Sequence, residues 1–181
     1  MAEKLVVISD MWGAKKGLWI TSYLGYLQQY FSIEFYDSRE LAQIDKTLST
    51  TDEVYNAFKN GGLDMAVRQL LAKETQKNHY LTFCAGGTIA WNAASKGLPM
   101  KSLYAISPID LELEPAVPDC PVTLLYGDAD TKVPPAEWAI ETNTVIETIP
   151  NFGHEMYSDE KIIKKVCMDL LELVMNKEYQ L

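Results

Sequence analysis

The sequence predicts an α/β fold with a doubly wound, mostly parallel sheet of six strands and helices on both faces. Short apolar runs such as Leu5–Ile8 lack polar alternation, which is typical of strands buried on both faces of a parallel sheet. Runs of this kind alternate with stretches of helical spacing along the chain. The 181 residues contain no repeat, linker or low-complexity segment, so we expect a single domain over residues 1–181.

The first third of the chain begins with the Leu5–Ile8 strand. A helix reaching to about Tyr30 follows, and Ser32–Tyr36 forms the second strand. The polar segment 37–51 receives no assignment. Thr50 and Glu53 have the spacing of a capping box, and the apolar positions after them predict one helix or a pair of helices broken near Gly61 and Gly62.

The second half of the chain supplies four more strands, with helices between them. Gly97 has the character of a helix end, a Pro-Pro pair opens a later helix, and Ser158 is expected to cap the last one. The predicted strands are 79–83, 102–106, 121–126 and 144–149, and the predicted helices include 88–95 and the segment that follows Pro134-Pro135.

Composition excludes several classes of partner. The chain has 16 Lys and Arg against 25 Asp and Glu, a net charge of −9, which disfavours nucleic acid and anionic membrane surfaces. Three cysteines make neither a disulfide framework nor a zinc pattern, and the short apolar run near the N-terminus is no signal peptide or membrane span. We therefore expect a cytoplasmic protein without cofactor or metal. A homodimer through the first or last strand is possible.

One stretch combines a strand, a reactive side chain and a helix. The predicted strand 79–83 leads into Cys84, and Ala85, Gly86 and Gly87 lie between it and the next predicted helix. This order indicates a nucleophile elbow, a tight turn that presents one side chain above the sheet and needs small residues behind it. Cys84 is the candidate nucleophile, and the alternative is a packing residue of the core.

Two other predicted strands end in groups that can assist a cysteine. Asp128 and Asp130 follow the strand 121–126, and His154 follows the strand 144–149. The carboxyl ends of parallel strands meet at one edge, where ligands of such folds bind. The only other histidine, His79, begins its strand and belongs to the opposite edge. His154 is therefore the candidate base, and either aspartate can orient it.

These motifs together resemble the α/β-hydrolase superfamily over Leu5 to about Val174. The acid of that family lies in a Gly-x-x-Asp-x-x-Val-Pro pattern, which residues 127–134 match, and its base follows a glycine, as in Gly153-His154. The resemblance selects Asp130 as the acid. It implies an oxyanion hole made by the N–H groups of Trp12 and Ala85. A cysteine at the elbow is similar to dienelactone hydrolases.

The chain also departs from the family pattern. The oxyanion loop reads Asp10-Met11-Trp12-Gly13 instead of His-Gly-x-Gly, the two leading antiparallel strands are missing, and the segment before strand 121–126 is too short for a cap. We expect Met11 and Trp12 to contact the substrate. Tyr157, just after the base, is either a further substrate contact or a solvated surface residue.

The resulting hypothesis is a hydrolase of carboxylic esters or thioesters, acting on a small-molecule or carrier-bound acyl substrate. It requires Cys84 to lie at an accessible rim beside His154. Two alternatives stay open. One is a binding protein with the same fold and a degraded site, in which Cys84 is inert; the other is an acyltransferase that uses the same three residues.

Overall fold

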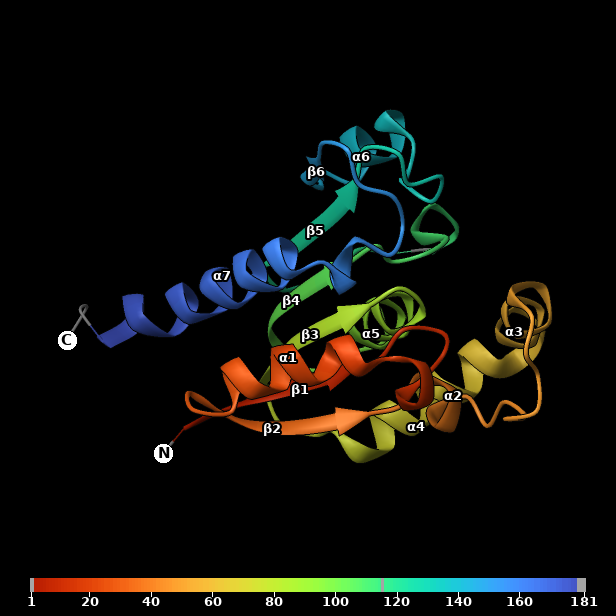
Figure 1. Ribbon diagram of the computed structural model, residues 1–181, viewed down its shortest axis with the longest axis horizontal. Helices are drawn as coiled ribbons and strands as arrows, with labels where there is room; N and C mark the ends of the chain where they lie inside the picture. The colour runs from red at the N-terminus through yellow and green to blue at the C-terminus, as the bar shows by residue number, and fades with distance from the viewer. Residues whose placement is uncertain (1, 115, 179–181) are drawn as a thin grey trace.

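The computed structural model describes residues 2–114 and 116–178. In this part of the chain six strands form one sheet, all parallel, in the order β2-β1-β3-β4-β5-β6 (Figure 1). The sheet confirms the predicted α/β class, and no antiparallel strand joins it within the described residues. The strands are β1 (Glu3–Ile8), β2 (Phe31–Tyr36), β3 (Asn78–Phe83), β4 (Met100–Ile106), β5 (Val122–Gly127) and β6 (Ile146–Ile149).

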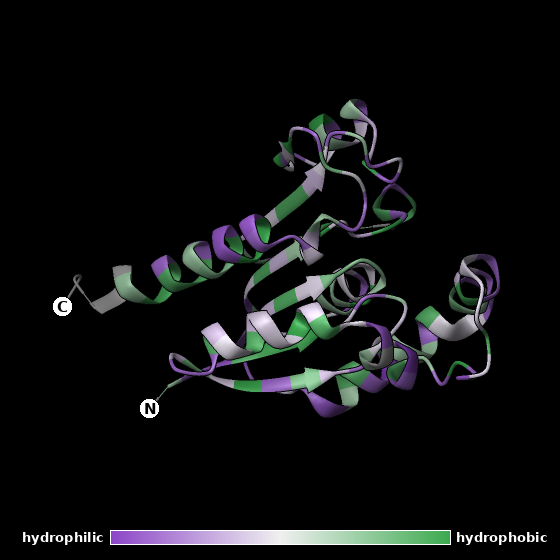
Figure 2. Ribbon diagram, viewed as in Figure 1, coloured by the Kyte–Doolittle hydropathy of each residue, from purple (hydrophilic) through white to green (hydrophobic). Residues whose placement is uncertain are grey.

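Helices cover both faces of the sheet. α1 (Leu18–Leu27) packs beside α7 (Glu160–Glu178) on one face, and α4 (Leu63–Lys73) packs beside α5 (Ala85–Ser95) on the other (Figure 1). Hydrophilic and hydrophobic residues alternate along α7 in Figure 2, as expected of a helix that buries one side. All six residues of β3 are buried, so the strand that leads to the predicted elbow lies in the centre of the core.

The segment between β2 and β3 contains more structure than the sequence predicted. The unassigned stretch 37–51 includes the short helix α2 (Ser38–Leu41), which Asp37 caps through its side chain. The predicted capping box at Thr50 is confirmed and begins α3 (Thr51–Ala57). The chain then bends through η2 (Phe58–Gly62), where Gly61 has φ +108°, before α4 begins. α3 stands beyond the carboxyl ends of the strands (Figure 1).

Two predicted helix boundaries are wrong. α5 begins at Ala85 instead of at residue 88, because the backbone turns directly from Cys84 into the helix. The last helix is capped by Asp159 instead of Ser158: the Asp159 side chain accepts the Lys161 N–H at 2.8 Å, whereas the Ser158 hydroxyl donates to the Glu155 carbonyl. The helix end at Gly97 is confirmed, with the Leu98 N–H donating to Ala93.

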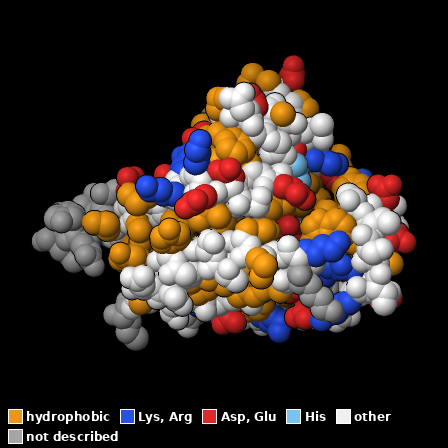
Figure 3. Space-filling view, in the orientation of Figure 1, with side chains coloured by type: hydrophobic (Ala, Val, Ile, Leu, Met, Phe, Trp, Pro, Cys, Tyr) orange, Lys and Arg blue, Asp and Glu red, His pale blue; other side chains and the backbone are white. Residues whose placement is uncertain are grey.

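Three further features concern the connection between β4 and β5, the apolar character of the helices, and the surface charge. The described residues between β4 and β5 hold only the short turn η3 (Leu111–Leu113), so no cap domain is inserted there. No helix within residues 2–114 and 116–178 is both long enough and apolar enough to cross a bilayer. On the face drawn in Figure 3, basic side chains lie scattered among acidic ones and form no continuous basic area.

Candidate active site

Cys84 occupies the turn between β3 and α5. Its backbone has φ +48° and ψ −122°, a conformation that non-glycine residues adopt rarely and that is typical of strained functional turns. The glycines behind it are required by space. A Cβ on Gly86 would lie 2.4 Å from the Ser9 carbonyl oxygen, and one on Gly87 would lie 2.8 Å from Pro108. The small residues therefore let α5 approach the sheet closely enough to form the elbow.

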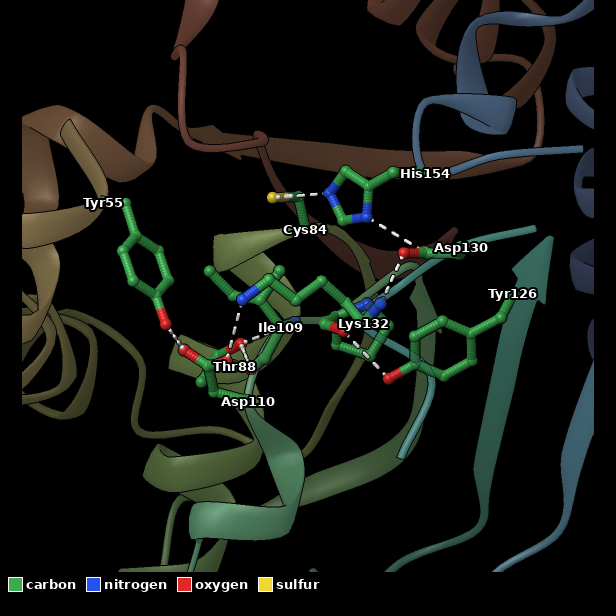
Figure 4. A network of polar contacts seen from close by, with 10 residues as sticks. Tyr55, Cys84, Thr88, Ile109, Asp110, Tyr126, Asp130, Lys132 and His154 are labelled. Carbon is green, nitrogen blue, oxygen red and sulfur yellow. Dashed lines mark hydrogen bonds and ion pairs between the residues drawn. The ribbon is translucent and has the colours of Figure 1, made fainter. Parts of the chain in front are cut away.

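The three residues predicted from separate strands meet at one point (Figure 4). The Cys84 sulfur lies 3.2 Å from Nε2 of His154, and Nδ1 of the same ring lies 2.9 Å from Oδ2 of Asp130. The ring thus bridges a thiol and a carboxylate, the arrangement in which an imidazole passes protons while its orientation is fixed. His79 lies elsewhere, at the start of β3, with Nδ1 2.7 Å from the Ser102 hydroxyl.

The loop after β5 holds the acid and touches the histidine loop. Oδ1 of Asp130 accepts the Lys132 N–H at 2.9 Å, which leaves Oδ2 for His154. Gly127 makes the contact between the two loops possible, because a Cβ there would lie 2.1 Å from the Phe152 carbonyl oxygen. Asp128, the alternative acid, is exposed and accepts the Asn151 N–H at 2.9 Å. It therefore binds the backbone of the loop that carries His154 and not the His154 ring.

The surroundings of His154 favour its charged form. Burial disfavours the imidazolium, but the hydrogen bonds to Asp130 and Cys84 and the negative charge of both groups outweigh burial and raise the pKa of His154 to about 10. The side chain keeps 30% of its exposure, so the ring can still exchange protons with solvent.

One requirement of the enzyme hypothesis is not met in this structure. Cys84 was expected at an accessible rim, but the residue retains only 1% of its exposure. At the elbow α5 lies close to β1, and Met11 in the neighbouring loop is itself buried. In this structure the elbow therefore leaves almost none of Cys84 at the surface.

The two expected oxyanion donors differ in their surroundings. The N–H of Ala85, in the first turn of α5, donates to no other residue in the part of the chain that the structure describes. It lies where the helix dipole favours negative charge. The N–H of Trp12 already donates to Oδ1 of Asp10 at 3.0 Å. Trp12 could serve an oxyanion only if this bond were broken.

Asp10 belongs to the site although the sequence analysis gave it no role. Its second oxygen, Oδ2, accepts the hydroxyl of Tyr157 at 3.2 Å. Burial raises the pKa of Asp10 to about 6, against the lowering effect of these two hydrogen bonds and of His154. The signal in the sequence was its position two residues after the end of the first strand, where functional side chains of parallel sheets gather.

The three residues that we expected to contact the substrate do not all lie at the same cavity. Trp12 and Tyr157 line one cavity of about 420 Å³, together with Asp10, whereas Met11 is part of the core and does not line it. Tyr157 is buried, so the idea of a solvated surface residue is wrong; its hydroxyl is used by Asp10 and its ring packs 4.7 Å from that of Trp19.

Comparison with solved structures identifies the fold. A protein from Xanthomonas campestris pv. campestris that is assigned to the α/β hydrolase superfamily superposes with a TM-score of 0.69 over 96% of this chain and 99% of its own, at 14% identity. The chain has the α/β-hydrolase fold. No protein-family model matches the sequence, and no curated protein matches it at a significant level.

Two further proteins with the α/β-hydrolase fold show what else the chain is similar to. Est1E from Butyrivibrio proteoclasticus, solved with ferulic acid bound, has a TM-score of 0.63 at 15% identity and covers 97% of this chain and 89% of its own. A protein from Klebsiella pneumoniae assigned as a dienelactone hydrolase also has 0.63 at 15% identity, covering 95% and 85%. The compact α/β-hydrolase fold thus accounts for nearly the whole chain.

Proposed function

We propose that this protein hydrolyses carboxylic esters or thioesters through a covalent intermediate on Cys84. The observation that carries the proposal is the continuous contact from the Cys84 sulfur through His154 to Asp130, at 3.2 and 2.9 Å. A cysteine nucleophile needs such a neighbour, because the thiolate is the reactive form and an adjacent imidazolium stabilises it.

The reaction would proceed in two halves. In the first, Sγ of Cys84 attacks the substrate carbonyl, His154 gives a proton to the leaving alcohol or thiol, and an acyl thioester forms on the enzyme. In the second, His154 takes a proton from water, the resulting hydroxide attacks the thioester carbonyl, and the carboxylic acid leaves while Cys84 is regenerated. Asp130 keeps Nε2 of the ring directed at the sulfur throughout.

Charge that develops on the carbonyl oxygen requires hydrogen-bond donors. The Ala85 N–H is available for this purpose and is supported by the amino end of α5. We propose it as the first donor. The Trp12 N–H becomes the second when it leaves the Asp10 carboxylate, so the loop 10–13 is expected to move as substrate binds.

The burial of Cys84 favours a second candidate function. A protein that keeps the α/β-hydrolase fold but only binds its ligand would have an inert, covered cysteine, and 1% exposure agrees with that. We prefer the hydrolase proposal because His154 contacts both Asp130 and Cys84, and a protein that only binds its ligand would not require these two contacts. Transfer of the acyl group to an alcohol or amine instead of water uses the same three residues and differs only in the product.

The test is hydrolysis of p-nitrophenyl and acyl-coenzyme A esters by the wild type and by Cys84→Ala. We expect release of the leaving group by the wild type and a loss of at least about a thousandfold in Cys84→Ala. Product analysis with added alcohol or amine acceptors separates hydrolysis from acyl transfer. Turnover that survives the substitution unchanged would remove Cys84 from the mechanism.

A further inference from the structure

A second cavity, of about 170 Å³, begins at the residue that follows the nucleophile. Ala85 and Thr88 of α5 form one side of it. The Thr88 hydroxyl donates to the Ile109 carbonyl at 2.6 Å and accepts the Ile109 N–H at 3.2 Å. Because the backbone uses this hydroxyl, the Thr88 side chain offers no free hydrogen-bond donor to the cavity.

The other walls of the cavity come from segments that the sequence analysis did not connect with the site. The α3–η2–α4 segment contributes the rings of Tyr55 and Phe58 and the side chain of Leu63, and the turn after β4 contributes Ile109 and Leu113. α3 therefore stands over one side of the site, although no cap domain lies between β4 and β5 among the described residues.

Three charged side chains, Lys59, Asp110 and Glu114, are among the residues that line this cavity, and Asp110 is paired with a cation. The Tyr55 hydroxyl donates to Oδ2 of Asp110 at 2.6 Å, and Nζ of Lys132 lies 3.2 Å from Oδ1 of the same carboxylate (Figure 4). The ammonium group also lies 4.6 Å from the centre of the Tyr55 ring. Since the Lys132 N–H binds Asp130, this network fixes the α3 wall to the loop that carries the proposed catalytic acid.

From its position beside the elbow and its largely apolar walls, we infer that this cavity binds the acyl part of the substrate, and that the acyl part is a compact, uncharged apolar group. The inference rests on the proposed function, because it takes Cys84 as the atom to which the acyl group is attached. A protein cavity of about 150 Å³ holds one benzene molecule, so 170 Å³ suits about six carbons or one ring and excludes long fatty acyl chains.

The first test is a series of p-nitrophenyl esters from acetate to dodecanoate. The wild type is expected to show its highest kcat/KM near the hexanoate and a fall for the dodecanoate. Leu113 lines the cavity but keeps 63% of its exposure, so Leu113→Trp narrows the cavity without disturbing the core. This variant should lose about tenfold or more on hexanoate and stay within about threefold on acetate.

A matched control is Ile140→Trp, on α6 (Ala136–Glu141). Ile140 is 79% exposed and does not line the cavity, so this variant should keep the wild-type preference. Equal kcat/KM for all chain lengths, or the same loss in both variants, would overturn the inference.

A second measurement separates this inference from the proposed function. Hexanoate is titrated into Cys84→Ala while the NMR signals of the Ala85 and Ile109 methyl groups, which both line the cavity, are followed. Shifts at both residues that are lost in Cys84→Ala with Leu113→Trp support the cavity even if no ester is hydrolysed. Absence of shifts together with uniform turnover of all esters would leave the hydrolase and remove the cavity.

Discussion

The hydroxyl of Tyr157 donates a hydrogen bond of 3.2 Å to Oδ2 of Asp10 and so joins the loop after β1 to the segment after His154. The other oxygen of the carboxyl group accepts the Trp12 N–H. These two bonds hold a buried carboxyl group beside the proposed catalytic residues. A carboxyl group in this position contributes both to the shape of the loop and to its response to pH.

Asp10→Asn should stabilise the protein at neutral and higher pH. Burial raises the pKa of Asp10 from 3.8 to about 6, so the native state binds more protons than the unfolded state between these values, and stability falls as pH rises through this window. The uncharged amide of the variant carries no such cost. Urea denaturation should show a gain of about 1–3 kcal/mol at pH 8 and a much smaller one at pH 4. Equal gains at both pH values would contradict the assignment.

Asp130→Asn should abolish most activity, whereas Asp128→Asn should leave it nearly unchanged. Asp130 accepts from His154, and an amide in its place favours the wrong tautomer of the ring; the expected loss in kcat is about 10³–10⁴. Asp128 is exposed and binds only the backbone of the histidine loop in the described structure. Steady-state kinetics of both variants decide the point, and the reverse order of losses would refute it.

Gly127→Ala should damage both stability and the site. Its Cβ would lie 2.1 Å from the Phe152 carbonyl oxygen, so the loops that carry Asp130 and His154 would be pushed apart. We expect a loss of about 3 kcal/mol or more in the free energy of unfolding. Gly25→Ala is the control: nothing lies within 4 Å of its Cβ position in helix α1, and alanine there should stabilise by about 0.5–1 kcal/mol. Similar effects at both positions would contradict this account.

Alkylation by iodoacetamide tests whether Cys84 is inert. At pH 7 we expect Cys84 to react at least about tenfold faster than Cys167, because His154 stabilises the thiolate whereas burial raises the pKa of Cys167 to about 11. His154→Ala should remove most of this advantage. Peptide mapping by mass spectrometry reports both cysteines in one sample. A Cys84 that reacts no faster than Cys167 would favour the binding protein.

Much of the fold could be predicted from the sequence because each strand is a short apolar run with a clear end. The three candidate catalytic residues were found for the same reason: parallel strands place whatever follows Phe83, Tyr126 and Ile149 at one edge of the sheet. Their functional roles stay predictions, but their meeting is a consequence of topology.

Other features depended on contacts between distant segments and could not be predicted. Thr50 and Glu53 marked the start of α3, but nothing local indicated that α3 would stand beside Ala85 and enclose a cavity. The burial of Cys84 likewise arises only when α5 and β1 pack together. Ser158 was preferred as a cap by residue type, while Asp159, one position later, has the required geometry.

The central claim is that Cys84 forms a covalent bond with the acyl group, and intact-mass spectrometry of the protein mixed with p-nitrophenyl hexanoate tests it most directly. We predict a mass increase of one hexanoyl group in the wild type within the first turnover, located on Cys84 by peptide mapping. No such increase should occur in Cys84→Ala. Ester hydrolysis without any adduct on Cys84, or an adduct on another residue, would contradict the claim.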